Sequence, residues 1–137
     1  MKKIITLFII FSIFYMFIGV ILGGLISGGP IAKYAETEEG HWLEAEHAFV
    51  NYIGFFSFSI MGLVYYFFPL LRNKSLFSKN LAFINFIFLN IGLFMMMIFT
   101  FTLHFLHFSF SSIGIMIGGI FLTLGYILFG INILKSL

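Results

Sequence analysis

Residues 81–103 read LAFINFIFLNIGLFMMMIFTFTL, a run of 23 residues without a charged side chain. At 1.5 Å per residue, a helix of about 20 apolar residues crosses the roughly 30 Å hydrocarbon core of a membrane. Three further apolar runs of comparable length lie at residues 4–26, 49–71 and 110–134. The sequence therefore predicts four transmembrane helices.

The composition agrees with a membrane protein. Hydrophobic residues make up 61% of the 137 residues and charged residues only 9%, whereas soluble domains carry roughly 25% charged residues. The short connections leave an all-α, up-down four-helix bundle as the expected fold. We expect a single domain over residues 1–137, with a long first loop over residues 28–47. Its four helices are expected over about residues 4–27, 48–71, 80–104 and 110–134.

Ionisable side chains are segregated between the two ends of these helices. One end carries all five acidic residues and all four histidines: Glu36, Glu38, Glu39, Glu44, Glu46, His41, His47, His104 and His107. The other end carries six of the seven Lys and Arg residues, Lys33 being the exception: Lys2, Lys3, Arg72, Lys74, Lys79 and Lys135. The positive-inside rule then predicts cytoplasmic termini and an extracytoplasmic Glu/His loop, in a multi-pass protein of the cell (inner) membrane. We expect the first run to be kept as a helix, because it exceeds a signal peptide's apolar region.

Several classes of function are disfavoured by residues that the sequence lacks. Cysteine is absent, which excludes disulfides and thiolate chemistry. No charged residue lies within the four apolar runs, whereas pumps and ion-coupled transporters place ionisable residues along their path. Nothing in the charge pattern indicates nucleic-acid binding.

Small and polar residues within the runs are expected to hold the helices together. Glycines let helix backbones approach closely, within the chain or between protomers; the relevant ones are Gly19, Gly23, Gly24, Gly28, Gly114, Gly118, Gly119 and Gly125. Polar side chains are expected to bridge helices at about 0.6 kcal/mol per bond: Asn51, Asn85, Asn90, Asn132, Thr100, Thr102, Tyr65 and Tyr66. In the first loop we expect a short helix over Glu36–Glu46, with Trp42 as an interface anchor.

His47 is the most informative single residue, because it stands where the second helix begins. Asn51, Gly54, Phe58 and Met61 follow it at spacings that share one face of an α-helix. A glycine two turns from a histidine leaves a flat gap of the kind that a porphyrin ring requires, and neutral imidazole is a good axial ligand for heme iron. The alternative is an interfacial histidine that hydrogen-bonds a loop.

Two stretches of this helix carry a resemblance: His47-Ala-Phe-Val-Asn51 and Met61-Gly62-Leu-Val-Tyr65-Tyr66-Phe-Phe-Pro69. They resemble helix ten of subunit I in the b-type oxidases of the heme-copper oxidase superfamily, where a His-x-His pair precedes a Met-Gly-x-x-Tyr-aromatic-x-x-Pro ending. Asn90-Ile-Gly92 and Ser111-Ser-Ile-Gly114 are similar to parts of the next two helices. The superfamily includes the catalytic subunits of cytochrome c oxidase and nitric oxide reductase, and the chain resembles a four-helix portion only.

The resemblance implies a heme ligand without a complete oxygen-reducing site. His47 aligns with the first histidine of the pair, which in the family ligates the high-spin heme, and Phe49 replaces the second, which ligates the low-spin heme. The histidines that bind copper in the family have no counterpart here. No complete heme-copper site is therefore implied in this chain alone, and whether the protein is an enzyme stays open.

A second alignment matches helix two of the nitric oxide reductases, which carries one histidine, a nearby Asn and a Gly-x-x-Tyr-Tyr-x-x-Pro ending. There the histidine holds a low-spin, bis-histidine heme. Subunit I has twelve helices in three similar arcs, so a four-helix chain resembles one arc. By this analogy a homo-oligomer is expected, and a trimer would resemble the whole subunit.

His104 and His107 are candidates for the second axial ligand to a heme on His47. They lie three residues apart at the outer end of the third helix, and so nearly on one face if the helix continues. The family places a histidine near this end of the corresponding helix. The alternative is a pair of interfacial histidines that cap carbonyl groups.

The acidic loop offers a different metal site. Glu44 and His47 have the i, i+3 spacing used by carboxylate di-iron bundles, and His41 is close in sequence. Zinc or copper bound by His41, Glu44 and His47 is therefore a further candidate. The alternative is a solvated acidic loop, which would also attract a basic electron donor such as cytochrome c.

Together these features predict a small membrane protein that binds heme b through His47, with Asn51 and Gly54 shaping the pocket. It would carry electrons, or bind a diatomic gas such as O₂ or NO, near the outer face of the membrane. Membrane lipid surrounds it, and cytochrome c or a quinol is the expected electron partner. The alternatives are a non-catalytic accessory or assembly subunit of a respiratory complex, and a metal-binding membrane protein that uses the outer Glu/His loop.

Overall fold

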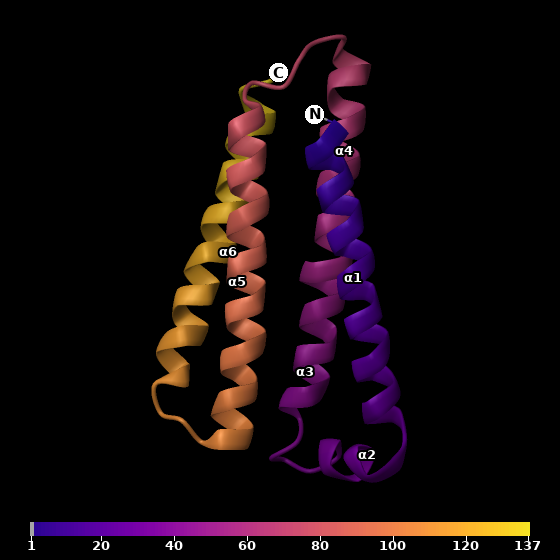
Figure 1. The fold of residues 1–137 in the computed structure, drawn as a ribbon, viewed down its shortest axis with the longest axis vertical. Coiled ribbons are helices and arrows are strands. Elements are labelled where there is room, and N and C mark those ends of the chain that lie inside the picture. The colour runs from indigo at the N-terminus through magenta and orange to yellow at the C-terminus, as the bar shows by residue number, and fades with distance from the viewer. Residues whose placement is uncertain (1) are drawn as a thin grey trace. The chain divides into compact units, whose positions relative to one another are not determined.

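The computed structural model describes residues 2–137, apart from the side chain of Pro30. All regular structure in these residues is helical (Figure 1). In chain order the elements are α1 (Lys2–Ser27), α2 (Gly29–Ala35), α3 (Trp42–Phe49), the π-helix η1 (Val50–Ser57), α4 (Phe58–Arg72), α5 (Lys79–Leu106) and α6 (Ser111–Leu134).

Four helical segments are long and apolar enough to cross a membrane: Lys2–Ser27, Trp42–Arg72, Lys79–Leu106 and Ser111–Leu134. The second of these comprises α3, η1 and α4. The all-α class is therefore confirmed, and so is the predicted number of helices long and apolar enough to span a membrane. The orientation of the termini stays a prediction.

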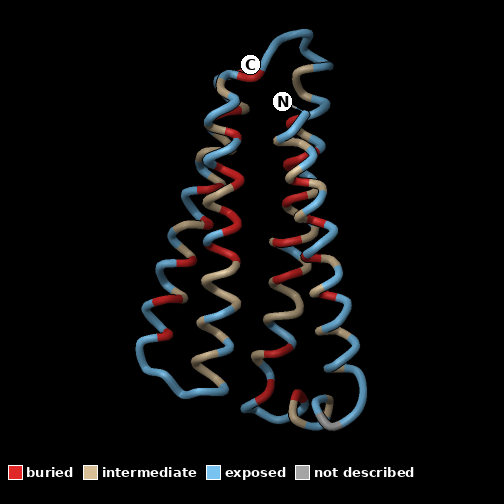
Figure 2. The backbone as a smooth tube through the Cα atoms, in the orientation of Figure 1, coloured by how far each residue is buried: buried red, intermediate tan, exposed pale blue. Residues whose placement is uncertain are grey.

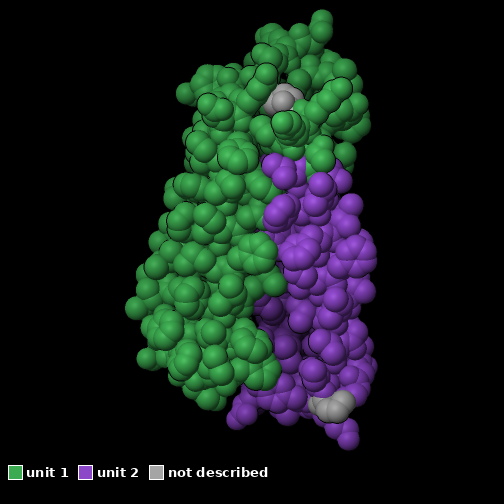
Figure 3. All heavy atoms as spheres, in the orientation of Figure 1, with its two compact units in different colours: residues 1–6, 61–137 green, residues 7–60 purple. Residues whose placement is uncertain are grey.

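The chain divides into two compact units, one of residues 1–6 with 61–137 and one of residues 7–60 (Figure 3). We call them the basic unit and the His47 unit, after the side chains that distinguish them. The prediction that residues 1–137 form one bundle stays a prediction.

In the basic unit, α5 and α6 form a helical hairpin whose close contacts depend on glycine. A Cβ at Gly92 would lie 2.7 Å from both the carbonyl oxygen of Gly118 and the backbone nitrogen of Leu122. One at Gly125 would lie 2.8 Å from a methyl carbon of Leu89. Buried residues recur along α6 and along the first half of α5, up to Leu93 (Figure 2). Among the glycines predicted to pack helices, Gly118 and Gly125 of α6 thus have this role within the chain, whereas Gly119 faces open space.

Polar side chains add directional links inside the same unit. The Tyr65 hydroxyl donates to Asn85 Oδ1 at 3.2 Å, and Asn85 Nδ2 donates to the carbonyl of Gly125 at 2.7 Å. Both side chains are fully buried. These bonds join α4 to α5 and α5 to α6, as predicted, because a polar group in an apolar interior needs a partner. Asn90 instead donates to the carbonyl of Phe86 in its own helix.

The connection between α4 and α5 is fastened to the end of the chain. Asn73 ends α4 in the left-handed conformation (φ 51°), and Ser78 caps α5 by accepting from the Leu81 amide at 3.1 Å. Asn132 holds Ser78 through two bonds: its Oδ1 accepts from the Ser78 amide at 3.0 Å, and its Nδ2 donates to the Ser78 carbonyl at 2.9 Å. The Asn132 side chain therefore satisfies both the backbone N–H and the backbone carbonyl of Ser78.

In the His47 unit, three aromatic rings form the core between α1 and the start of α4. Phe58 lies 5.6 Å from Phe8 and 5.3 Å from Tyr15 between ring centroids, and none of the three has exposed surface. Aromatic pairs at these separations stabilise beyond the area that they bury.

The first loop differs from its prediction. A short helix is present, but it is α2 over Gly29–Ala35, and the expected helix over Glu36–Glu46 is wrong. Residues 36–41 form turns that fold back on α2, where a Cβ at Gly40 would overlap the carbonyl of Tyr34. The second spanning helix already begins at Trp42, whose indole donates to the Tyr34 hydroxyl at 3.5 Å. The helix predicted to begin at about residue 48 therefore starts earlier, and His47 lies inside it.

The hairpin packing gives a direct test. Gly92→Ala should lower the free energy of unfolding by about 1–3 kcal/mol, the usual cost of overpacking, because its Cβ would meet backbone atoms of α6 that cannot move aside independently. Thermal or denaturant unfolding in detergent, followed by far-UV circular dichroism, measures the change. Gly119→Ala is the matched control, since its Cβ would meet open space. Equal losses in the two variants would contradict the assignment.

Candidate functional site

His47 is held against α1 by a hydrogen bond of its ring. Its Nδ1 lies 2.9 Å from the carbonyl oxygen of Gly19, and the side chain is half-buried. A carbonyl oxygen only accepts hydrogen bonds, so Nδ1 must carry the proton. The neutral ring then has its lone pair on Nε2, which is the only ring nitrogen able to accept a bond or coordinate a metal.

Asn51 packs beside His47, four residues later. Its Nδ2 donates to the backbone carbonyl of His47 at 2.9 Å and lies 3.3 Å and 3.5 Å from the two ring nitrogens. Since Nδ1 already carries a proton, the amide can donate only to Nε2 on the ring, at the longer distance. The predicted proximity of His47 and Asn51 is therefore observed, with the amide fixed mainly by the helix backbone.

Two glycines of α1 make room for these side chains. A Cβ at Gly19 would lie 2.7 Å from the Asn51 amide nitrogen, and one at Gly23 would lie 2.8 Å from Cε1 of His47. The Gly19-x-x-x-Gly23 pattern therefore serves packing within the chain, one of the two predicted uses. Gly24 and Gly28 have open space where a Cβ would be. The sequence alone does not show that these glycines contact His47 and Asn51, because it does not show which helices pack together.

The π-helix η1 begins three residues after His47 and was not predicted. A π-helix closes its hydrogen bonds at i→i+5 and is found often at functional sites, but no residue type marks one in a sequence. The face predicted through Gly54 assumes 3.6 residues per turn throughout, and this assumption fails between Val50 and Ser57. Val50 and Gly54 within η1, and Phe58 directly after it, are buried. Gly54 is thus buried, but not two α-helical turns from His47.

His104 and His107 belong to the basic unit. α5 ends at Leu106, and His107 follows in the left-handed conformation (φ 54°), with its backbone N–H bonded to the carbonyl of Thr102. The two histidines therefore do not continue one helix face, because that expectation required the helix to extend through His107. His104 is half-buried in the last turn, whereas His107 is exposed. Their roles as second axial ligands stay predictions.

The acidic loop brings together two of the three residues of the alternative metal site. His41 Nδ1 lies 3.7 Å from Glu44 Oε2, and their side chains are 62% and 59% exposed. An exposed pair at this distance contributes little stability. Residues 2–137, as far as the structure describes them, hold no group of three or more His, Asp or Glu side chains placed to bind a metal ion. His47 is thus not joined to His41 and Glu44.

No protein-family model, curated protein or solved structure matches this chain. The resemblance to oxidase subunit I therefore stays a prediction from the quoted residues.

The protonation of His47 can be measured. In heme-free, ¹⁵N-labelled protein in alkaline buffer, the ring should carry its proton on Nδ1, because the Gly19 carbonyl accepts from that nitrogen. Long-range ¹H–¹⁵N NMR spectra of the imidazole distinguish the two nitrogens. Gly23→Ala should change the ring signals, since its Cβ would displace Cε1, whereas Gly24→Ala should leave them unchanged. Protonation on Nε2 in the unaltered protein would contradict the geometry.

Proposed function

We propose that this chain is a small membrane protein that binds heme b with His47 as an axial ligand to the iron. The observation that carries the proposal is the bond between His47 Nδ1 and the Gly19 carbonyl. Histidines that bind metals usually donate their other ring N–H to a carbonyl or carboxylate, which fixes the ring and directs the remaining lone pair. The His47 ring has this arrangement.

The residues beside His47 support the same role. Asn51 and the two glycines of α1 limit where the ring can move, so little conformational freedom would be lost on ligation. The heme iron would supply one-electron redox chemistry or binding of a diatomic gas such as O₂ or NO. In this proposal Asn51 positions the ring, and Gly54 of the adjoining π-helix shapes the pocket.

The coordination number decides between the two activities. A second histidine, His104 or His107, would give a six-coordinate iron suited to electron transfer, whereas one histidine would leave a position open for a gas. We further propose that the Glu/His loop is extracytoplasmic and that both termini are cytoplasmic, in the cell (inner) membrane, because six of the seven basic residues lie away from that loop. A homotrimer and an electron partner such as cytochrome c or a quinol belong to the same proposal.

A reduced-minus-oxidised absorption spectrum of protein expressed with ample heme tests the proposal. The unaltered protein should show a Soret band and a sharp α-band. His47→Ala should lose more than nine tenths of the bound heme, because the iron loses its ligand, while far-UV circular dichroism stays unchanged. His41→Ala is the matched control and should keep the full spectrum, since His41 lies in the exposed loop.

Adding carbon monoxide separates the two forms of the site. A spectrum that carbon monoxide leaves unchanged indicates six-coordinate iron, and His104→Ala or His107→Ala should then create a carbon monoxide-sensitive species. A shift in the unaltered protein indicates an open position. A full Soret band in His47→Ala would refute the proposal, and a colourless protein that copurifies with partners would favour an accessory subunit.

A further inference from the structure

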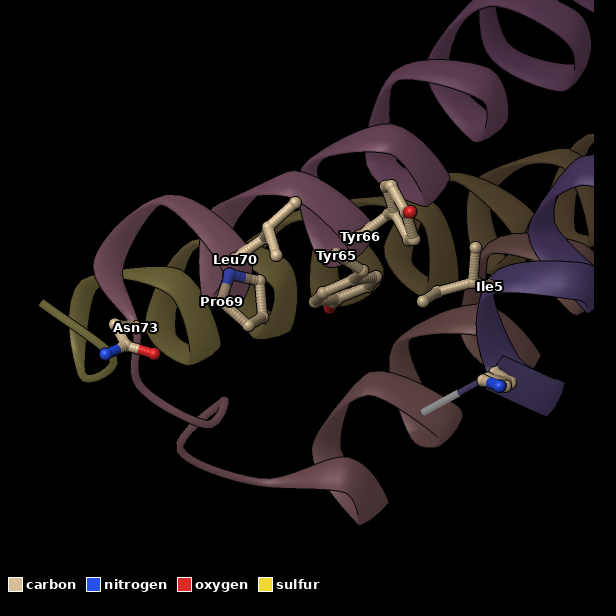
Figure 4. Close-up of a pocket in the computed structure, with 7 residues that line it drawn as sticks. Ile5, Tyr65, Tyr66, Pro69, Leu70 and Asn73 are labelled. Carbon is tan, nitrogen blue, oxygen red and sulfur yellow. The ribbon is translucent and has the colours of Figure 1, made fainter.

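A cavity of about 350 Å³ lies within the basic unit, between the start of α1 and the end of α4. Figure 4 shows its lining side chains coming from these two segments. Ile5, Tyr65, Pro69 and Leu70 give it a largely apolar wall, and Lys2 and Asn73 add a cation and an amide. The cavity is separate from His47, which belongs to the other unit.

The charged side chains of the basic unit are all positive. Residues 1–6 and 61–137 contain six Lys or Arg residues and no Asp or Glu, since every acidic residue of the chain lies between positions 36 and 46. All six lie at or within a few residues of a helix terminus: Lys2, Lys3, Arg72, Lys74, Lys79 and Lys135. No acidic side chain of the unit can neutralise them, so the unit presents a positive field to a bound molecule.

Three of these cations already have partners in the structure. Arg72 and Lys74 donate to the Leu137 backbone oxygen at 2.9 Å and 3.3 Å, and Lys135 Nζ lies 4.9 Å from the centre of the Phe77 ring. Lys2 is the basic residue that lines the cavity. Lys2 therefore adds a positive charge to a lining that is otherwise uncharged and largely apolar.

We propose that the cavity binds an anionic phospholipid. The phosphate would meet the Lys2 ammonium at the α1 side of the cavity, and the acyl chain would lie along Ile5, Pro69 and Leu70. A free phosphate would leave the apolar wall uncovered, and a neutral lipid would leave Lys2 without a counter-charge. Basic pockets between membrane helices on the cytoplasmic side bind such headgroups for these reasons, and the positive-inside rule assigns this end of the chain to that side.

Native mass spectrometry of the detergent-solubilised full chain tests the proposal with two probes of matched acyl chains, phosphatidylglycerol and phosphatidylcholine. The unaltered protein should bind phosphatidylglycerol more tightly. Lys2→Gln should weaken that binding about five-fold, the equivalent of about 1 kcal/mol for one basic side chain near an anionic lipid. Lys3→Gln is the matched control: it removes the same charge one residue away, at a side chain that does not line the cavity, and should retain binding.

A second pair of variants tests the apolar wall. Leu70→Trp should reduce binding of both lipids by narrowing the cavity, and it should still fold because Leu70 is 67% exposed. Leu71→Trp, at a neighbouring position that is 81% exposed and outside the lining, should bind as the unaltered protein does.

Three results would overturn the proposal. Equal losses in Lys2→Gln and Lys3→Gln would indicate diffuse surface charge instead of a site. Equal binding of the two lipids by the unaltered protein would remove the role of the anion. Displacement of the lipid by inorganic phosphate in ten-fold excess would assign the cavity to a simple anion.

Discussion

Close approach between helices is the constraint on which the rest of this structure depends. The chain contains 22 phenylalanines in 137 residues, and side chains of that size keep helix axes apart wherever they face one another. Glycine removes the obstacle locally. In α6 the space is taken by backbone and leucine atoms of α5, which draws two helices together. In α1 the space at Gly19 and Gly23 is taken by a histidine and an amide, which draws polar groups onto a helix surface.

The four spanning helices could be predicted from the sequence because their signal is cumulative. More than twenty apolar residues in a row indicate a span whatever the order of the residues. The first loop lacks such redundancy, and its short helix α2 begins at Gly29, one residue before Pro30. Proline in the first turn of a helix is a known start signal, so α2 was within reach of prediction. The acidic residues from Glu36 to Glu46 instead fall in the turns and in the first part of α3.

The candidate site was predictable only in its local part. His47 and Asn51 are four residues apart in one helix, and the structure places them side by side. Their contacts with α1 join residues separated by 28 positions, and no local pattern identifies which glycine pair of the chain receives them. Likewise, His104 and His107 share one face only in a helix that continues, whereas α5 ends at Leu106 and His107 itself is left-handed.

The π-helix has a consequence for how the second spanning segment encodes its geometry. Within η1, the Ser57 hydroxyl donates to the carbonyl of Tyr52, five residues earlier, at 3.0 Å, so a side chain supports the wide turn where water would be scarce. A regular α-helix advances by about 100° for each residue, and loss of one residue from η1 would turn Phe58 by about that angle relative to His47. The number of residues between His47 and Phe58 therefore determines which side chains face α1, just as the identity of those residues does. Two sequences of similar composition that differ by one residue in this interval would point different surfaces at α1.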